Sequence, residues 1–139
     1  MLPALFFLMA GGPVLKLPAP TAGELAPRTT ARGLPLAGIH RKVTLGRYAR
    51  KWQTENGRPV WRLAIQSPGA AAVRLHITGF GEGKGTLRVG QRTYTGGGDF
   101  WSDVILSDTA EVEFRPAGTR RELPFGIDRL SHLKVRPIP

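Results

Sequence analysis

The 139-residue chain has no cysteine, and its acidic residues are scarce beside the basic ones. Without cysteine there is no disulfide framework, no thiol nucleophile and no thiolate metal site. Ten Asp and Glu stand against twenty Lys and Arg, which gives a formal net charge of +10. An excess of this kind attracts polyanions such as nucleic acid, anionic lipid or acidic glycans. The length allows a single hydrophobic core and therefore one domain.

A hydrophobic run long enough to span a bilayer is also missing. The apolar stretch Leu2–Ala10 falls well short of the roughly 20 residues that a transmembrane helix needs. Its length fits the hydrophobic region of a secretory signal, although the first charge is Lys16 and no basic residues precede the stretch. We interpret residues 1–12 as a degraded signal peptide, which predicts a secreted or periplasmic protein without a transmembrane segment.

Glycine and proline are plentiful, with 18 and 12 residues, as expected for a turn-rich β fold. Residues 13–38 combine Pro, Ala, Gly and Thr without helical or strand periodicity. We interpret them as a linker within a disordered N-terminal arm. Residues 39–133 form the expected domain, and residues 134–139 a C-terminal tail.

Alternating apolar and polar residues, separated by Gly-rich turns, fill the segment 39–133. This pattern predicts an all-β fold, namely an antiparallel, jelly-roll-like β-sandwich of about eight short strands. The expected strands are Ile39–Trp52, Val60–Gln66, Ala72–Thr78, Thr86–Val89, Gln91–Thr95, Phe100–Leu106, Thr109–Arg115 and Pro124–Leu133.

Local signals add detail to this prediction. The pair Asn56-Gly57 predicts a tight hairpin turn, because both residues tolerate positive φ. The strands Phe100–Leu106 and Thr109–Arg115 are expected to form a hairpin around Ser107-Asp108. In the strand Ala72–Thr78, alternation places Arg74, His76 and Thr78 on the face away from the core. The strongest core candidates are Trp61, Leu75, Phe100 and Phe114.

Three sequence motifs and a fourth segment resemble those of a known domain family. They are Trp61-x-Leu63-x-Ile65-x-Ser67-Pro68-Gly69-Ala70, Phe100-Trp101-Ser102, and Asp108-Thr109-x-x-Val112-Glu113-Phe114, followed by Ile127–His132. In this order they resemble the noncatalytic N-terminal β-sandwich, or pro-region, of secreted bacterial trypsin-like and lysyl-endopeptidase-like serine proteases. The resemblance implies an accessory domain that interacts with a peptidase, either in cis or in trans. It also implies a stand-alone copy or an early stop, because no peptidase segment follows.

Catalytic and metal-binding patterns are absent or incomplete in the sequence. Ser131, His132 and Asp128 are neighbours, but alternation sends Ser131 and His132 to opposite faces. The loop 81–85 lacks the phosphate-loop signature and leads into a strand. The acids Asp99, Asp103 and Asp108 do not have calcium-loop spacing, and Glu111 and Glu113 share an ordinary solvated face. The histidines lack zinc spacing. We therefore predict a noncatalytic protein without cofactor or metal.

Two surfaces remain as candidates for binding. Trp101 and Tyr94 flank a Gly-rich loop, where exposed aromatic rings could stack on a sugar and give a carbohydrate- or cell-surface-binding module. Between residues 26 and 54 there are seven basic residues and no acid. This segment predicts weak polyanion binding, with no zinc-finger or RNA-binding motif for specific nucleic-acid recognition. Its candidate contacts in the domain are Arg41, Lys42, Arg47, Arg50 and Lys51.

Overall fold

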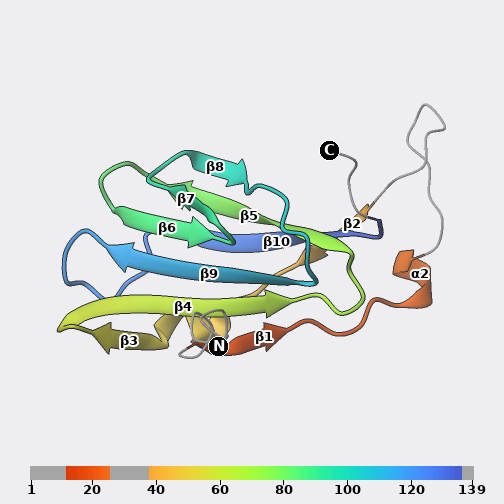
Figure 1. Ribbon diagram of the computed structural model, residues 1–139, viewed down its shortest axis with the longest axis horizontal. Helices are drawn as coiled ribbons and strands as arrows, with labels where there is room; N and C mark the ends of the chain where they lie inside the picture. Colours follow the sequence, from red (N-terminus) through yellow and green to blue (C-terminus); the bar gives the residue numbers. More distant parts are fainter. Residues whose placement is uncertain (1–11, 26–37, 136–139) are drawn as a thin grey trace, which may run out of the picture.

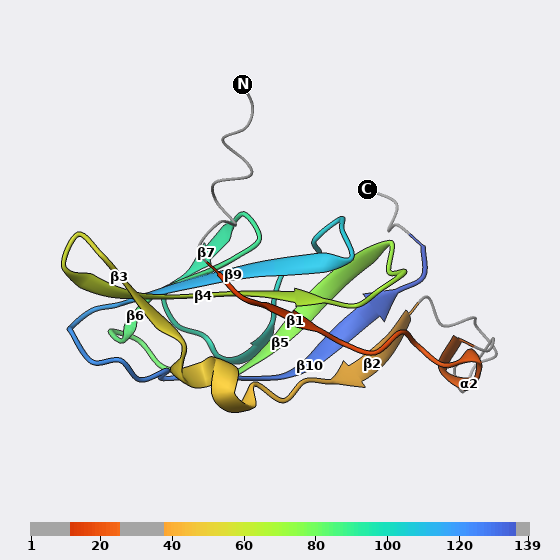
Figure 2. The same cartoon turned by 90° about the horizontal axis from the view of Figure 1, so that it is seen from below.

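Two antiparallel-dominated sheets pack face to face in the computed structural model, which describes residues 12–25 and 38–135 (Figure 1, Figure 2). The predicted all-β sandwich is confirmed. Helical structure among the described residues is limited to α2 (Ala22–Leu25) and the 3₁₀ helix η1 (Gly46–Arg50). Neither approaches the length and apolarity that a membrane-crossing helix requires. The predicted signal peptide lies, apart from residue 12, outside the described residues.

The larger sheet contains six strands in the order β1-β4-β9-β6-β7, with β3 also paired to β4. Their bounds are β1 (Val14–Lys16), β3 (Trp52–Glu55), β4 (Arg58–Gln66), β6 (Gly85–Val89), β7 (Arg92–Tyr94) and β9 (Thr109–Pro116). Strands β1 and β3 share one edge of β4, because β3 pairs with its first half and β1 with its last residues. The β1 pairing is parallel.

The smaller sheet contains four strands in the order β2-β10-β5-β8. Their bounds are β2 (Gly38–Lys42), β5 (Ala72–Phe80), β8 (Gly98–Trp101) and β10 (Gly126–Leu133). Strand β8 pairs with β5, whereas β9 pairs with β4 and β6 in the other sheet. The predicted hairpin between Phe100–Leu106 and Thr109–Arg115 is therefore wrong. The chain leaves β8 at Ser102, whose hydroxyl accepts a hydrogen bond from the Leu75 amide at 3.0 Å and holds this turn against β5.

Two further predictions need correction. The expected strand Ile39–Trp52 is broken, because η1 separates β2 from β3. The expected linker 13–38 is ordered in its first part, where β1 extends the larger sheet and α2 follows. In α2, the amide of Glu24 donates to the Thr21 hydroxyl and the Glu24 carboxylate accepts from the Thr21 amide, which is a capping box. The second part of that linker, residues 26–37, lies outside the described residues.

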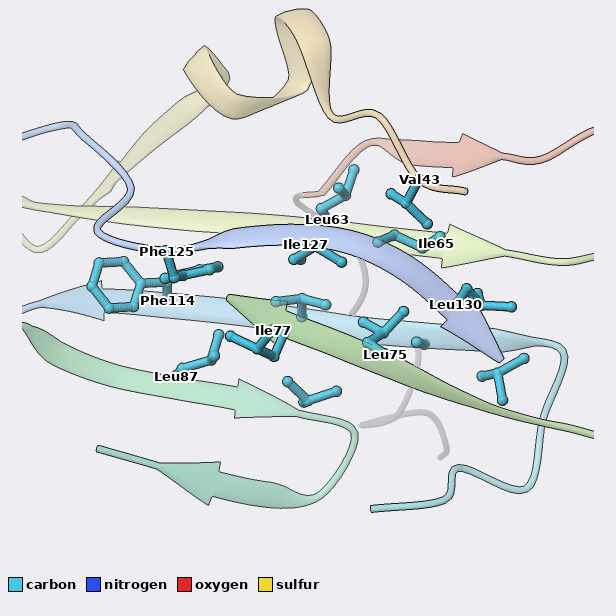
Figure 3. Packing of buried hydrophobic residues seen from close by; sticks show 14 of the residues in the cluster. Val43, Leu63, Ile65, Leu75, Ile77, Leu87, Phe114, Phe125, Ile127 and Leu130 are labelled. Carbon is cyan, nitrogen blue, oxygen red and sulfur yellow. The ribbon is translucent and has the colours of Figure 1, made fainter. Parts of the chain in front are cut away.

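The core fills the space between the sheets (Figure 3). Trp61, Leu75 and Phe114 are fully buried, as predicted, and Phe100 is half-buried against the cluster. The rings of Phe114 and Phe125 meet edge to face with centroids 5.2 Å apart. The predicted turn is confirmed as well, since Asn56 and Gly57 join β3 to β4 with φ of 53° and 78°. A favourable turn and an apolar inner face together specify the register of this part of the larger sheet.

Candidate binding site: the Trp101 face

Trp101 ends β8 and lies on the outer face of the smaller sheet. In the ladder between β5 and β8, Trp101 is opposite His76 and Phe100 is opposite Ile77. Ile77 is fully buried in the core, and Phe100 packs against the same cluster. Successive strand residues point to opposite faces. The indole of Trp101 is therefore directed away from the core.

Two histidine rings and two guanidinium groups surround the Trp101 indole. The ring centroids of His40 and His76 lie 4.8 and 4.9 Å from the indole centroid. The guanidinium carbons of Arg74 and Arg129 lie 5.6 and 5.5 Å from it, within the distance of a cation–π interaction. These neighbours come from β2, β5 and β10. All four strands of the smaller sheet thus contribute to one site.

Two further side chains define the extent of this surface. Lys42 is exposed and lies opposite Arg129 in the ladder between β2 and β10. Ser131 lies in register between His40 and Arg74, yet only 7% of it is exposed. An indole lying across β10 accounts for that burial. We call this surface the Trp101 face and define it by six residues: His40, Lys42, Arg74, His76, Trp101 and Arg129.

Positive charge on the Trp101 face is only partly balanced. Oδ1 of Asp128 lies 2.7 Å from Nδ1 of His76, and Oδ2 of Asp128 lies 3.8 Å from Nε of Arg129. Within the described residues, neither Lys42 nor Arg74 has a carboxylate at ion-pair distance. Nε of Arg74 donates to the carbonyl of Ser102 at 3.1 Å, so the positive charges of Arg74 and Lys42 are not neutralised by a carboxylate of the described residues.

A β-bulge brings Asp128 to this surface. The pairing of β10 with β5 shifts by one residue between Ile127 and Arg129. A bulge of this kind inserts an extra residue into one strand and re-aims the side chains around it. Ile127 and Leu130 can consequently both be buried in the core, while Asp128 and Arg129 are both exposed.

The basic residues predicted to contact a polyanion are divided among different places. Lys42 belongs to the Trp101 face. The guanidinium of Arg47 and the amine of Lys51 lie over the ring of Tyr48, at 5.5 and 5.3 Å from its centroid. Arg50 is exposed at the end of η1. The basic segment is thus not one continuous binding strip.

Arg41, the fifth of these residues, is directed into the protein. Its Nη1 donates to Oγ of Ser67 at 3.0 Å, and its Nη2 donates to the carbonyl of Pro18 at 2.6 Å. Oγ of Ser67 in turn lies 2.7 Å from Nδ1 of His132. Arg41, Ser67 and His132 are only 8%, 0% and 2% exposed. Burial, followed by the charge of Arg41, lowers the pKa of His132, so the imidazole is neutral at pH 7.

The buried Ser67–His132 pair is not part of the Ser131–His132–Asp128 triad that was considered from the sequence. Ser131 and His132 do lie on opposite faces of β10, as alternation predicts. His132 contacts Ser67, and Asp128 contacts His76 on the other side of the sheet. Because Ser67 is fully buried and its hydroxyl also accepts from Arg41, a substrate carbonyl has no approach to it. The arrangement ties together β2, β10 and the end of β4.

Tyr94 does not share a surface with Trp101. Its ring packs on Phe100 with centroids 4.8 Å apart, and Phe100 is on the core side of β8. The Tyr94 hydroxyl accepts a hydrogen bond from the amide of Asp103 at 2.9 Å. The two aromatic residues proposed as one ligand surface are therefore on opposite sides of β8.

Each of the acidic residues considered as calcium ligands interacts with its own partners within the protein. Asp99 accepts from the Gly79 amide, Asp103 pairs with Arg92, and Asp108 accepts from Gln66 and Thr109. Across residues 12–25 and 38–135, no group of three or more His, Asp or Glu side chains is close enough to hold a metal ion.

The outer face of the larger sheet is organised around ion pairs. Arg62 donates to Glu55 at 2.7 Å and to Glu113 at 2.9 Å, and Arg115 bonds to the same two carboxylates at 2.6 and 3.2 Å. Hydrogen bonds from Arg62 and Arg115 lower the pKa of Glu55 to about 2. We call this surface the paired face; it comprises Glu55, Arg62, Arg88, Glu113 and Arg115.

Glu113 is held as a carboxylate despite its partial burial. Burial by itself raises the pKa of Glu113, but the hydrogen bonds and charges of Arg62 and Arg115 outweigh it and hold that pKa below its usual range. A carboxyl with a lowered pKa is a poor general acid. Glu111 and Glu113, which share the outer side of β9, therefore do not present an acid–base pair.

Sequence reasoning placed Arg74 and His76 on an outer face but did not join them to Trp101. Their alternation with Val73, Leu75 and Ile77 was the available signal. His40 and Arg129 carry no such signal, because their place beside Trp101 depends on the pairing of β2 and β5 with β10.

Comparisons with protein families, with curated proteins and with solved structures find no match to this chain. The resemblance to the accessory domain of secreted serine proteases accordingly stays a prediction that rests on the sequence motifs.

Proposed function

We propose that this domain is a noncatalytic module that binds polyanions on the Trp101 face. The observation that carries the proposal is the placement of Lys42, Arg129 and Arg74 on three adjacent strands around an outward-facing tryptophan. Lys42 and Arg129 are opposite each other, and Arg74 lies two positions further along β5, opposite Ser131, so the three cations form a cluster on this face. A cluster of cations on one surface matches a ligand with repeated negative charges.

The paired face supports this choice of surface. Both sides of the sandwich carry arginines, but those of the paired face are already bonded to carboxylates. An anion that approached them would have to displace Glu55 or Glu113. On the Trp101 face Lys42 and Arg74 have no such competitor among the described residues. The surplus charge of the protein is consequently available at one place.

A neutral sugar fits the Trp101 face less well. Sugar hydroxyl groups both donate and accept hydrogen bonds, whereas the guanidinium groups of Arg74 and Arg129 beside the indole only donate them. The uncharged Ser131 is buried beneath this layer. The surroundings of Trp101 therefore favour an anionic ligand over a neutral glycan.

The test is a salt titration of binding to inorganic polyphosphate with two matched double variants. Lys42→Gln/Arg129→Gln removes two charges from the Trp101 face, and Lys84→Gln/Arg120→Gln removes two exposed charges elsewhere. The slope of log affinity against log salt should fall by about 1.5–2 for the first variant, because each lost contact removes about one unit. The second variant should behave like wild type. Equal losses in both variants would assign binding to net charge alone and overturn the proposal.

A second candidate is the accessory role beside a secreted serine peptidase. The resemblance rests in part on the motif Phe100-Trp101-Ser102, which includes the central residue of the Trp101 face. A partner protein could therefore bind the same surface. Its test is the activity of a trypsin-like peptidase on a small substrate, with and without the domain. An effect that Trp101→Ala removes would support this role, and activity that the domain leaves unchanged would count against it.

A further inference from the structure

We propose that the polyanion is a single-stranded nucleic acid, bound without sequence preference, with one base stacked on the Trp101 indole. This inference rests on the proposed function and specifies its ligand. It needs two properties of the site beyond positive charge: a planar surface for a base and cations placed along a backbone.

The planar surface is the Trp101 indole itself, because the rings of His40 and His76 beside it are tilted to it by 36° and 52°. The indole originates on β8, at one edge of the smaller sheet, and reaches the ring of His40 on β2 at the other edge. The low exposure of Ser131 on the intervening strand β10 fits an indole that lies flat across the sheet. Trp101 is partly exposed, and we infer that a base stacks on the exposed part of its indole, since every base has a π-face.

Arg74 and Arg129 place two guanidinium groups against the indole, and Nε of Arg74 donates to the carbonyl of Ser102 at 3.1 Å. Both guanidinium groups lie within 5.6 Å of the indole centroid, and the Arg129 side chain is 45% exposed. Unstacked bases bind to guanidinium planes as well as to aromatic rings. The same groups can turn their N–H donors to phosphate oxygens, which a planar guanidinium binds in bidentate fashion. Lys42 supplies a further point charge opposite Arg129.

The arrangement favours a single strand over a duplex. In a duplex the faces of the bases are covered by their neighbours, so an indole on a sheet surface has no free base to stack on. A single strand exposes bases and phosphates together. Specific base recognition would need side chains that read base edges. The Trp101 face instead presents cations and rings, in keeping with the lack of a specific nucleic-acid motif in the sequence.

The experiment compares four ligands with the wild-type chain: an oligothymidylate of about ten nucleotides, an abasic oligomer of the same length, inorganic polyphosphate and heparin. The oligothymidylate should bind about tenfold more tightly than the abasic oligomer, since a stacked base contributes at least this much. Trp101→Ala should reduce its affinity to that of the abasic oligomer and leave polyphosphate binding unchanged. Trp101→Phe, which keeps a ring, should recover part of the difference.

The outcomes separate the two proposals. Equal affinity for the intact and abasic oligomers, with polyphosphate still bound, would overturn the nucleic-acid inference and leave polyanion binding in place. Tighter binding of heparin than of oligothymidylate, lost in Trp101→Ala, would also overturn it and identify a sulfated glycan as the ligand. Failure of the wild-type chain to bind any of these polyanions would overturn both proposals. A urea unfolding transition of Trp101→Ala shows that the variant is folded, because an unfolded basic chain would also bind polyphosphate.

Discussion

On the outside of the larger sheet, Arg62, Arg88 and Arg115 each have a carboxylate within 3.7 Å. On the outside of the smaller sheet, Lys42 and Arg74 have none among the described residues. Both surfaces belong to the same sandwich and use the same kind of basic side chain. They differ in whether the charge is satisfied within the protein, and this difference separates a surface that stabilises the fold from one that can bind a ligand.

The paired face connects strands that are distant in sequence. Arg62 of β4 bonds to Glu55 of β3 and to Glu113 of β9, so one side chain joins three neighbouring strands. The Trp101 face joins its strands differently, through an indole that lies across them. An indole contacts its neighbours without neutralising them, which leaves the cations available. Three predictions test whether this contrast is real, ordered from the largest expected change in stability to the smallest.

Arg62→Ala should lower the free energy of unfolding by about 2 kcal/mol, because it removes charge-assisted hydrogen bonds and leaves the half-buried Glu113 without its closest partner. Urea denaturation measures the change. The matched control is Arg88→Ala, whose guanidinium is 3.7 Å from Glu113 and outside hydrogen-bond distance; it should have a much smaller effect. Equal effects from the two variants would show that the bonding of Arg62 is not what stabilises the paired face.

The paired face should also make stability depend on pH in the acid range. The folded pKa of Glu55, about 2, lies below its ordinary value of 4.5. The stabilisation from this carboxylate is therefore complete above pH 4.5 and is lost as the pH falls towards 2. Glu55→Gln should be less stable than wild type at pH 6, and the gap should close between pH 4.5 and 2 when followed by urea midpoints.

Glu122→Gln is the control for this measurement. Glu122 pairs with Arg120 at 3.1 Å, but both side chains are largely exposed. Exposed pairs of this kind contribute little to stability. The variant should match wild type at both ends of the pH range. A gap between Glu55→Gln and wild type that persisted at pH 2 would contradict the assigned role of the Glu55 carboxylate.

Lys42→Gln, on the Trp101 face, should change the free energy of unfolding by less than about 0.5 kcal/mol, as is usual for an exposed side chain without partners. The same variant should weaken polyphosphate binding. Thermal or urea unfolding together with a binding titration distinguishes the two effects. A large loss of stability would mean that Lys42 supports the fold, and the contrast between the two faces would fail.

The sequence allowed the core and the outward faces to be predicted well. Trp61, Leu63 and Ile65 occupy every second position of their strand, and all three are buried. The positions of these residues follow from the two-residue period of a strand, which is a local property. The Asn56-Gly57 turn is local as well. The failed hairpin after Phe100 is instead a question of partner choice, because β8 joins a strand more than twenty residues upstream.

The candidate site could be predicted only in part for the same reason. Trp101 and Lys42 were candidates from their residue types, whereas alternation only placed Arg74 on an outer face. Their assembly with Arg129 depends on a sheet order that no local pattern contains, and on a bulge at Asp128. The Ser67–His132 contact joins residues 65 positions apart and therefore could not be predicted from local sequence patterns either.

Strand β10 lies between β2 and β5 in the sheet, although the ribosome synthesises it long after both. Before residues 126–133 leave the ribosome, β2 has no partner in its sheet and the indole has no strand to lie across. Sheets built from such distant segments form slowly, because long loops must close first. A nascent chain with Lys42, Arg74 and Trp101 already synthesised therefore lacks the Trp101 face. The proposed ligand binding would begin only when β10 is in place, and it would then serve as a probe of completed folding.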